Sequence, residues 1–162
     1  MTRVVIPGSF DPPTNGHLHL IERASNLFPE VCVLISVNGS KESLFSQEER
    51  ADLLRSITKV FGNVTVDVWD GLVGVYAKEK GHHALLRGLR SEADFAYELD
   101  IANINHSLSH SLETLFLPTR QDKSVIRSSY VKELWSMGTV VDEFVPEIVA
   151  RRLRDKLTTR QK

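Results

Sequence analysis

The chain has 162 residues, the length of about one globular domain, with 41% apolar and 25% charged residues. Twenty Lys and Arg against twenty-one Asp and Glu give a formal charge of −1 at pH 7, so no general basic field attracts nucleic acid or a membrane surface. The sequence lacks a signal-peptide core and a run of about 18 apolar residues. We therefore expect a cytoplasmic protein with no nucleic-acid or membrane partner, forming a single domain over 1–162 in which 158–162 are a disordered tail.

Short apolar runs alternate along the chain with segments of helical period. We predict strands at 3–7, 31–37, 64–69, 84–88 and 114–118 and helices at 17–28, 46–61, 71–81, 92–108 and 146–157. In the first helix, Leu18, Ile21, Leu27 and Phe28 are assigned to one apolar stripe. The alternation predicts an α/β fold: a single-domain, Rossmann-like, doubly wound parallel sheet of five strands with helices on both faces. Ligands of such sheets bind beyond the carboxyl ends of the strands.

Residues 7–17, Pro-Gly-Ser-Phe-Asp-Pro-Pro-Thr-Asn-Gly-His, join the first strand to the first helix. Ser9 presents a hydroxyl just after the strand, and the helix that opens at Asn15 has free N–H groups that favour an anion. His17 lies in the first turn, where it can donate a hydrogen bond to a phosphate oxygen. The alternative is a plain turn with His17 as a polar surface residue. Neither a P-loop nor a G-x-G-x-x-G motif is present, so a nucleotide would be bound in another way.

Two arginines follow the fourth predicted strand. Arg87 ends that strand and Arg90 comes three residues later, so two guanidinium groups can bind phosphate oxygens in bidentate fashion. Glu98 could reach a ribose hydroxyl from the next helix. The alternative is a structural ion network in which these arginines pair with Glu92 and Asp94.

Two further segments fall at the same predicted edge. Lys41 follows the second strand, and its alternative interpretation is a solvated surface charge. Residues 123–129 place a lysine, an arginine and three serines ahead of a helix, where hydroxyl and amide groups form an anion site. The alternative there is an N-cap with a solvated charge beside it. The single cysteine, Cys32, lies in an apolar run and is expected to be a buried core residue.

In this order the segments resemble a known family. Thr14-Asn15-Gly16-His17 resembles the (T/H)-x-G-H signature of the nucleotidyltransferase superfamily. Residues 85–98, Leu-Leu-Arg-Gly-Leu-Arg-Ser-Glu-Ala-Asp-Phe-Ala-Tyr-Glu, and 128–133, Ser-Ser-Tyr-Val-Lys-Glu, resemble the bacterial phosphopantetheine adenylyltransferase family. The resemblance extends over residues 3–157. It implies transfer of the adenylyl group of ATP to 4′-phosphopantetheine by direct in-line attack, giving dephospho-coenzyme A and pyrophosphate.

The resemblance also implies partners and site residues. Mg²⁺ would accompany the ATP phosphates without a protein metal site, the assembly would be a homohexamer, and coenzyme A would be a feedback inhibitor. The implied catalytic residues are His17, Lys41, Arg90 and Ser128. The implied ATP-binding residues are Ser9, Phe10, His17, Gly88, Leu89, Arg90, Glu98, Lys123, Ser124, Val125, Ile126, Arg127, Ser128 and Ser129. The implied phosphopantetheine-binding residues are Ser9, Lys41, Leu72, Val73 and Arg87.

The chain departs from the family pattern at a few positions. Ile6 stands where tyrosine is frequent, Glu42 where a second basic residue is common, Lys123 in place of an aromatic residue and Arg127 in place of a serine. We expect altered affinity and not lost activity. Two other functions stay open from the sequence: another adenylyl- or cytidylyltransferase of the superfamily, acting on nicotinamide mononucleotide or glycerol phosphate, and a non-catalytic sensor of coenzyme A or a nucleotide.

Overall fold

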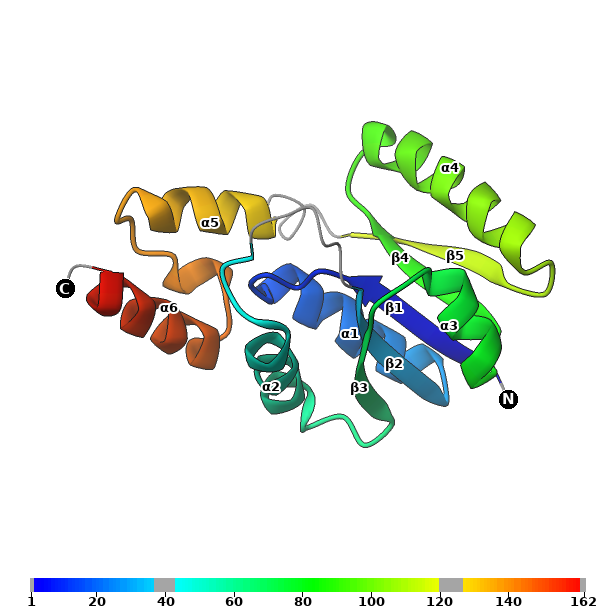
Figure 1. The fold of residues 1–162 in the computed structure, drawn as a ribbon, viewed down its shortest axis with the longest axis horizontal. Coiled ribbons are helices and arrows are strands. Elements are labelled where there is room, and N and C mark those ends of the chain that lie inside the picture. The colour runs from blue at the N-terminus through cyan, green and yellow to red at the C-terminus, as the bar shows by residue number, and fades with distance from the viewer. Residues whose placement is uncertain (1, 37–42, 120–126, 161–162) are drawn as a thin grey trace.

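The computed structural model describes residues 2–36, 43–119 and 127–160, and side chains as far as residue 158. Its centre is one five-stranded sheet with the strand order β3-β2-β1-β4-β5, in which every neighbouring pair is parallel (Figure 1). This confirms the predicted doubly wound α/β fold. The strands are β1 (Arg3–Gly8), β2 (Glu30–Ser36), β3 (Val64–Trp69), β4 (Ala84–Leu89) and β5 (Glu113–Pro118).

Helices alternate with these strands and continue after the last of them. They are α1 (Asn15–Leu27), α2 (Gln47–Thr58), α3 (Val73–Lys80), α4 (Glu92–Leu108), α5 (Ser128–Ser136), the 3₁₀ turn η2 (Asp142–Phe144) and α6 (Glu147–Arg160). Because α6 continues through Arg160, the tail that we expected to begin at residue 158 is helical there, and that part of the prediction was wrong. Within the described ranges, no helix is both long and apolar enough to cross a membrane.

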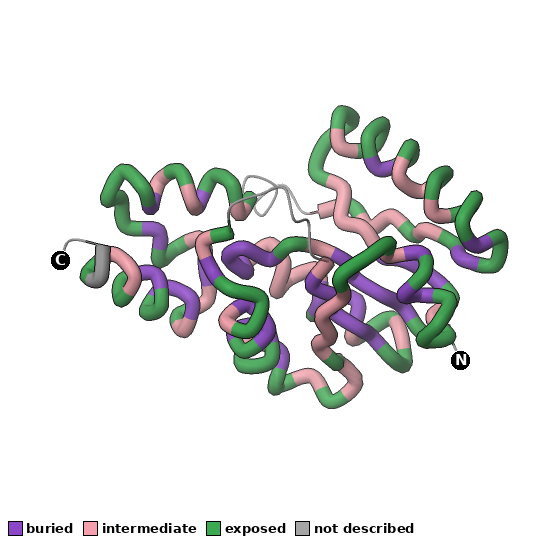
Figure 2. The backbone as a smooth tube through the Cα atoms, in the orientation of Figure 1, coloured by how far each residue is buried: buried purple, intermediate pink, exposed green. Residues whose placement is uncertain are grey.

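The side chains of β1 alternate between two cores, one on each face of the sheet. Val4 packs in a core with residues of α1 and α2, whereas Val5 packs on the other face against Tyr76 of α3. Buried residues run along the central strands, while α4 is largely exposed (Figure 2). Cys32 is buried in the second core, as expected.

The predicted apolar stripe of α1 is confirmed at Ile21 and Phe28 and wrong at Leu27. Ile21 and Ala24 are fully buried, but Leu27 is 62% exposed. Leu27 follows Ile21 by six positions. At 3.6 residues per turn, this spacing places Leu27 about 120° around the helix from Ile21 and so away from the buried face. Ala24, at the i+3 position, covers the sheet in its place.

A third apolar cluster lies beside the sheet, where α5 and α6 pack next to α2 (Figure 1). It contains Leu53 of α2 together with Trp135, whose indole N–H donates a 3.0 Å hydrogen bond to the carbonyl of Leu153. This cluster holds α5 in place, and α5 begins with the predicted site residue Ser128.

Candidate active site

A cavity of about 240 Å³ opens at the carboxyl edge of the sheet between β1 and β4. In the order β3-β2-β1-β4-β5 this is the switch point, where doubly wound sheets bind ligands. Ile6, one of the departures from the family pattern, lines the cavity. Seven of the predicted site residues also line it: Ser9, Phe10, His17, Arg87, Gly88, Arg90 and Glu98.

His17 is held by the cap of α1. Thr14 is the N-cap, its hydroxyl accepts the N–H of His17, and the Nδ1 atom of His17 accepts the backbone N–H of Thr14 at 3.0 Å. Since Nδ1 is an acceptor, the proton of the neutral imidazole lies on Nε2, which is therefore a donor. Burial, followed by the positive charges of Arg90 and Arg87, lowers the pKa of His17 to about 4. The ring is therefore neutral at pH 7.

Phe10 supports the His17 ring from the loop before α1. The two ring centroids lie 4.9 Å apart in an edge-to-face arrangement. Phe10 is buried and has a φ of +49°, a conformation that bulky residues rarely adopt. Gly8 makes this possible, because a Cβ atom there would lie 3.0 Å from the Phe10 ring. A small residue at position 8 is thus a packing requirement of the site.

Arg87 and Glu98 form a bidentate ion pair. The Nε and Nη2 atoms of Arg87 donate to the two carboxylate oxygens of Glu98 at 2.7 and 2.6 Å, and Nη1 donates to the carbonyl of Pro7 at 2.5 Å. Arg87 thus ties the ends of β1 and β4 to the second turn of α4. The ion-network alternative holds for this arginine, but with Glu98 as the partner.

Arg90 has the partner that the same alternative anticipated. Its Nε donates to Asp94 at 2.9 Å, one turn into α4. The other Asp94 oxygen lies 3.7 Å from a guanidinium nitrogen of Arg127, the N-cap residue of α5. The Arg127 departure from the family pattern therefore has an ion-pair partner, and this pair links the first turns of α4 and α5.

The other predicted residues that the structure describes do not line this cavity. Ser128 begins α5, and its hydroxyl donates to the carbonyl of Pro12 at 2.8 Å. Leu72 is the N-cap residue of α3. The remaining ones that the structure describes are Val73, Leu89, Arg127 and Ser129. Lys41, Lys123, Ser124, Val125 and Ile126 lie outside the described residues, as does the Glu42 departure.

Comparisons with known proteins agree with this geometry. Residues 5–134 match the cytidylyltransferase-like family. The chain is 46% identical over 160 residues to the phosphopantetheine adenylyltransferase of Streptomyces coelicolor, covering 99% of this chain and 100% of that protein. It is 45% identical over 156 residues to the phosphopantetheine adenylyltransferase of Caldanaerobacter subterraneus, covering 96% and 98%.

The chain belongs to the phosphopantetheine adenylyltransferase family. Its fold is similar to the solved structure of a putative nicotinate-nucleotide adenylyltransferase from Vibrio parahaemolyticus. The TM-score is 0.66 at 16% identity, and the match covers 94% of this chain and 99% of that one. That likeness concerns the fold alone.

Two buried charges hold the loop of this phosphopantetheine adenylyltransferase family member, and our sequence analysis missed both. Arg50 of α2 donates from Nη1 to the carbonyl of Ser9 at 2.8 Å. Asp11 accepts the backbone N–H groups of Leu44 and Phe45, each at 2.8 Å. Both residues are only 4% exposed, and these hydrogen bonds give their buried polar groups partners inside the protein. Asp11 stood in the motif, but its partners follow the second strand and only the tertiary structure brings them close.

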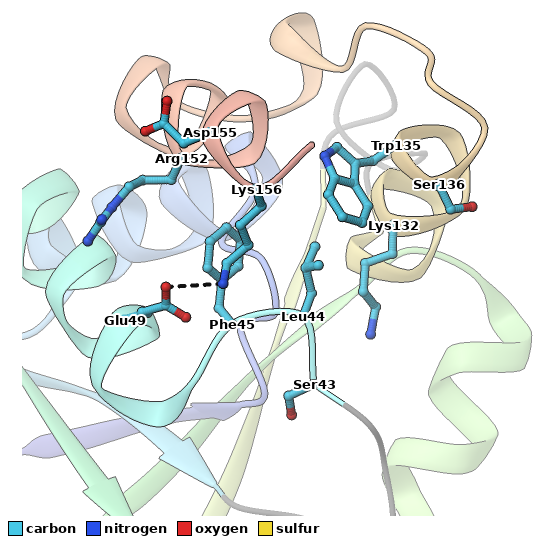
Figure 3. Close-up of a pocket in the computed structure, with 10 residues that line it drawn as sticks. All are labelled: Ser43, Leu44, Phe45, Glu49, Lys132, Trp135, Ser136, Arg152, Asp155 and Lys156. Atoms are coloured by element: carbon cyan, nitrogen blue, oxygen red, sulfur yellow. Dashed lines mark ion pairs between the residues drawn. The ribbon is translucent and has the colours of Figure 1, made fainter. Parts of the chain in front are cut away.

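A second, larger cavity of about 670 Å³ lies between the start of α2 and helices α5 and α6 (Figure 3). Leu44, Phe45 and Trp135 line it with apolar surface, and Glu49 pairs with Lys156 at 3.1 Å on one side. The amine of Lys156 also lies 4.9 Å from the centre of the Phe45 ring. None of the predicted site residues that the structure describes lines this cavity.

Proposed function

We propose that the protein transfers the adenylyl group of ATP to 4′-phosphopantetheine, giving dephospho-coenzyme A and pyrophosphate. One observation carries the proposal: the 240 Å³ cavity gathers several hydrogen-bond donors and cations, while the one carboxylate among the described residues that line it is paired with Arg87. His17 offers Nε2–H, Arg90 offers a guanidinium, and the first turn of α1 presents backbone N–H groups. Such an array stabilises the negative charge that develops on transferring phosphates.

The acidic residues that line the cavity indicate which kind of nucleophile the site can use. Glu98 is the only Asp or Glu among the described residues that line it, and both of its oxygens accept from Arg87. A hydroxyl nucleophile would need a base to remove its proton, whereas a phosphate nucleophile is already an anion. The site therefore favours a phosphate acceptor that attacks the α-phosphorus of ATP directly, with pyrophosphate leaving in line.

The proposed roles of the residues follow from their contacts and from the family resemblance. His17 and Arg90 stabilise charge on the reacting phosphates, and the family resemblance adds Lys41 and Ser128 to this group. Positioning and charge stabilisation carry most of the catalysis in such transfers. We further propose that Mg²⁺ arrives with ATP, because phosphate oxygens are the ligands that this hard cation prefers.

We also propose a cytoplasmic homohexamer that coenzyme A inhibits. An exposed apolar stripe on α4 supports assembly: Tyr97 is 65%, Ile104 54% and Leu108 44% exposed on one side of the helix. Light scattering should give a mass six times that of the 18.3-kDa chain. Ile104→Glu should reduce that mass, and a wild-type mass of 18.3 kDa would refute the assembly.

Acceptor selection tests the proposed reaction against its alternatives. The protein is incubated with MgATP and, in separate reactions, 4′-phosphopantetheine, nicotinamide mononucleotide or glycerol phosphate, and the adenylylated products are identified by mass spectrometry. We expect dephospho-coenzyme A from the first reaction at the highest rate. A faster reaction with nicotinamide mononucleotide or glycerol phosphate would reassign the acceptor. Binding of ATP without any product would identify a sensor.

A further inference from the structure

Asp11 is a buried carboxylate whose two oxygens meet three donors. Oδ1 accepts the N–H of Phe45 at 2.8 Å, while Oδ2 accepts the N–H of Leu44 at 2.8 Å and lies 3.3 Å from the amine of Lys132. Leu44 and Phe45 lead into α2, and Lys132 belongs to α5. One side chain of the loop before α1 thus contacts two other elements of the fold through charge-assisted hydrogen bonds.

Each element that Asp11 contacts carries a residue of the proposed site. Asp11 itself belongs to loop 9–14, which joins Ser9 to the start of α1 and His17. Lys132 follows Ser128 by one turn of α5, and the hydroxyl of Ser128 donates to the carbonyl of Pro12 in the same loop. Leu44 follows Lys41 by three positions in the sequence.

The arrangement of these elements is visible from the side of the larger cavity. In Figure 3 the segment with Leu44 and Phe45 runs below α5, and Lys132 points from α5 toward that segment. Asp11 lines neither this cavity nor the 240 Å³ cavity. Its effect on the reaction must therefore pass through the residues that it holds.

We propose that Asp11 is a positioning residue that fixes loop 9–14 against the segment leading into α2 and against α5. The loop leads to His17, α5 begins with Ser128, and Leu44 follows Lys41 by three positions in the sequence. We therefore expect Asp11 to fix the relative placement of these charge-stabilising groups. The proposal rests on the function proposed above and on the role given there to Lys41. An error in placement of about 1 Å can lower the rate of such a reaction about a hundredfold.

The side-chain chemistry explains why aspartate suits this position. Two N–H donors and an ammonium group need two oxygens with free lone pairs, and among small side chains only a carboxylate provides them. In Asp11→Asn the amide keeps the shape of the side chain but turns one acceptor into a donor. One of the backbone N–H groups of Leu44 and Phe45 then loses its partner, and the Lys132 amine loses an anion.

The test is a double-mutant cycle on the full chain with Asp11→Asn and Lys41→Ala, read as turnover under saturating MgATP and 4′-phosphopantetheine. We expect Asp11→Asn to lower turnover at least tenfold in the wild-type background and less than threefold in the Lys41→Ala background. A merely structural role would produce the same loss in both backgrounds, and that result would overturn the proposal. Asp52→Asn, an exposed acid of α2 paired with Arg55, is the matched control and should leave turnover unchanged.

A second variant separates the two kinds of contact. Lys132→Met removes the contact to α5 and leaves both backbone hydrogen bonds of Asp11 in place, so we expect a loss of about threefold, smaller than that of Asp11→Asn. A loss as large as that of Asp11→Asn would overturn the part played by the two backbone contacts, and no loss would overturn the part played by α5. If wild type releases pyrophosphate but Lys41→Ala is fully active, the positioning proposal fails and the proposed reaction stands. If wild type releases none, the proposed reaction itself fails.

Hydrogen exchange on wild type covers the case in which Asp11→Asn does not fold. The amides of Leu44 and Phe45 should exchange at least a hundredfold more slowly than unprotected amides, because Asp11 accepts both. Exchange of these two amides at the unprotected rate would overturn the proposal without any variant.

Discussion

The backbone N–H of Thr14 donates to Nδ1 of His17, and this contact decides which ring nitrogen of His17 carries the proton. Nε2 is left as the donor of a neutral imidazole at the cavity. At neutral pH His17 therefore offers a hydrogen-bond donor at the cavity, and we propose that phosphate accepts it. The helix cap and the chemistry of the site depend on the same two residues.

The charge state of His17 gives a direct prediction. Burial and the two neighbouring arginines hold its pKa at about 4, below its ordinary 6.5, so its ring resonances in NMR should stay unchanged from pH 8 to pH 5 with the proton on Nε2. The unfolded chain binds more protons than the folded one between pH 6.5 and 4. The free energy of unfolding should consequently decrease as the pH is lowered from 6.5 to 4, and it should decrease less in His17→Asn. Titration of the ring near pH 6.5 would contradict this assignment.

Removal of the His17 donor should affect turnover more than binding. We expect His17→Ala to lower turnover at least ~100-fold, the loss typical of one well-placed transition-state donor, with much smaller changes in the KM values. His19→Ala, on the same helix but not lining the cavity, is the control and should stay within threefold of wild type. A loss below tenfold in His17→Ala would show that His17 does not act on the reacting phosphates.

The close approach of Gly8 to Phe10 predicts the effect of a single methyl group. In Gly8→Ala the new Cβ would lie 3.0 Å from the Phe10 ring, which cannot retreat freely because it is buried against His17. We expect a loss of about 1–3 kcal/mol in the free energy of unfolding and a turnover reduced at least tenfold. Denaturant titration and the pyrophosphate assay measure the two quantities.

Gly62→Ala is the matched control for this change. No atom lies within 4 Å of a Cβ at position 62, so stability and turnover should be close to those of wild type. Equal behaviour of the two alanine variants would show that the contact between positions 8 and 10 is dispensable.

Most of the fold could be predicted from the sequence because the local hydrophobic patterns and the alternation of strands and helices both indicate a parallel sheet. The strand 64–69 and the helix 92–108 coincide with the predicted bounds, and Ser46 and Glu49 form a capping box at the predicted start of α2. The first helix begins at Asn15, where the sequence analysis placed its opening, and Thr14 is its cap. Parallel strands then bring the segments after β1 and β4 to one edge.

The pairing of the charges could not be predicted in the same way. Arg90 pairs with Asp94, four residues on, as proximity in the sequence suggests. Arg87 instead pairs with Glu98, because the second turn of α4 lies over the end of β4. The rotation of α4 on the sheet decides this, and a single sequence does not contain it. The partners of Asp11 depend on tertiary structure for the same reason.

The Arg87–Glu98 pair makes a stability prediction. Arg87→Ala leaves the carboxylate of Glu98 without its bidentate partner in a largely buried position, so we expect a loss of about 2–3 kcal/mol in the free energy of unfolding. Arg3→Ala is the matched control, since the Arg3–Glu30 pair is half exposed and its removal should cost less than about 1 kcal/mol. Equal losses would mean that the buried pair contributes no more than a surface pair.

The same variant has a kinetic signature. If Arg87 binds phosphopantetheine, as the family resemblance implies, Arg87→Ala raises the KM for phosphopantetheine more than the KM for ATP. Initial-rate measurements with each substrate varied in turn check this ordering. A larger increase in the KM for ATP would show that Arg87 contributes to binding ATP instead.

Pyrophosphate release is the most direct measure of the proposed adenylyl transfer to 4′-phosphopantetheine. The rate is measured for wild type and His17→Ala with MgATP, with and without 4′-phosphopantetheine. We expect release that requires 4′-phosphopantetheine and falls at least ~100-fold in the variant. Binding of ATP without release under these conditions, or release that does not depend on phosphopantetheine, would contradict this expectation.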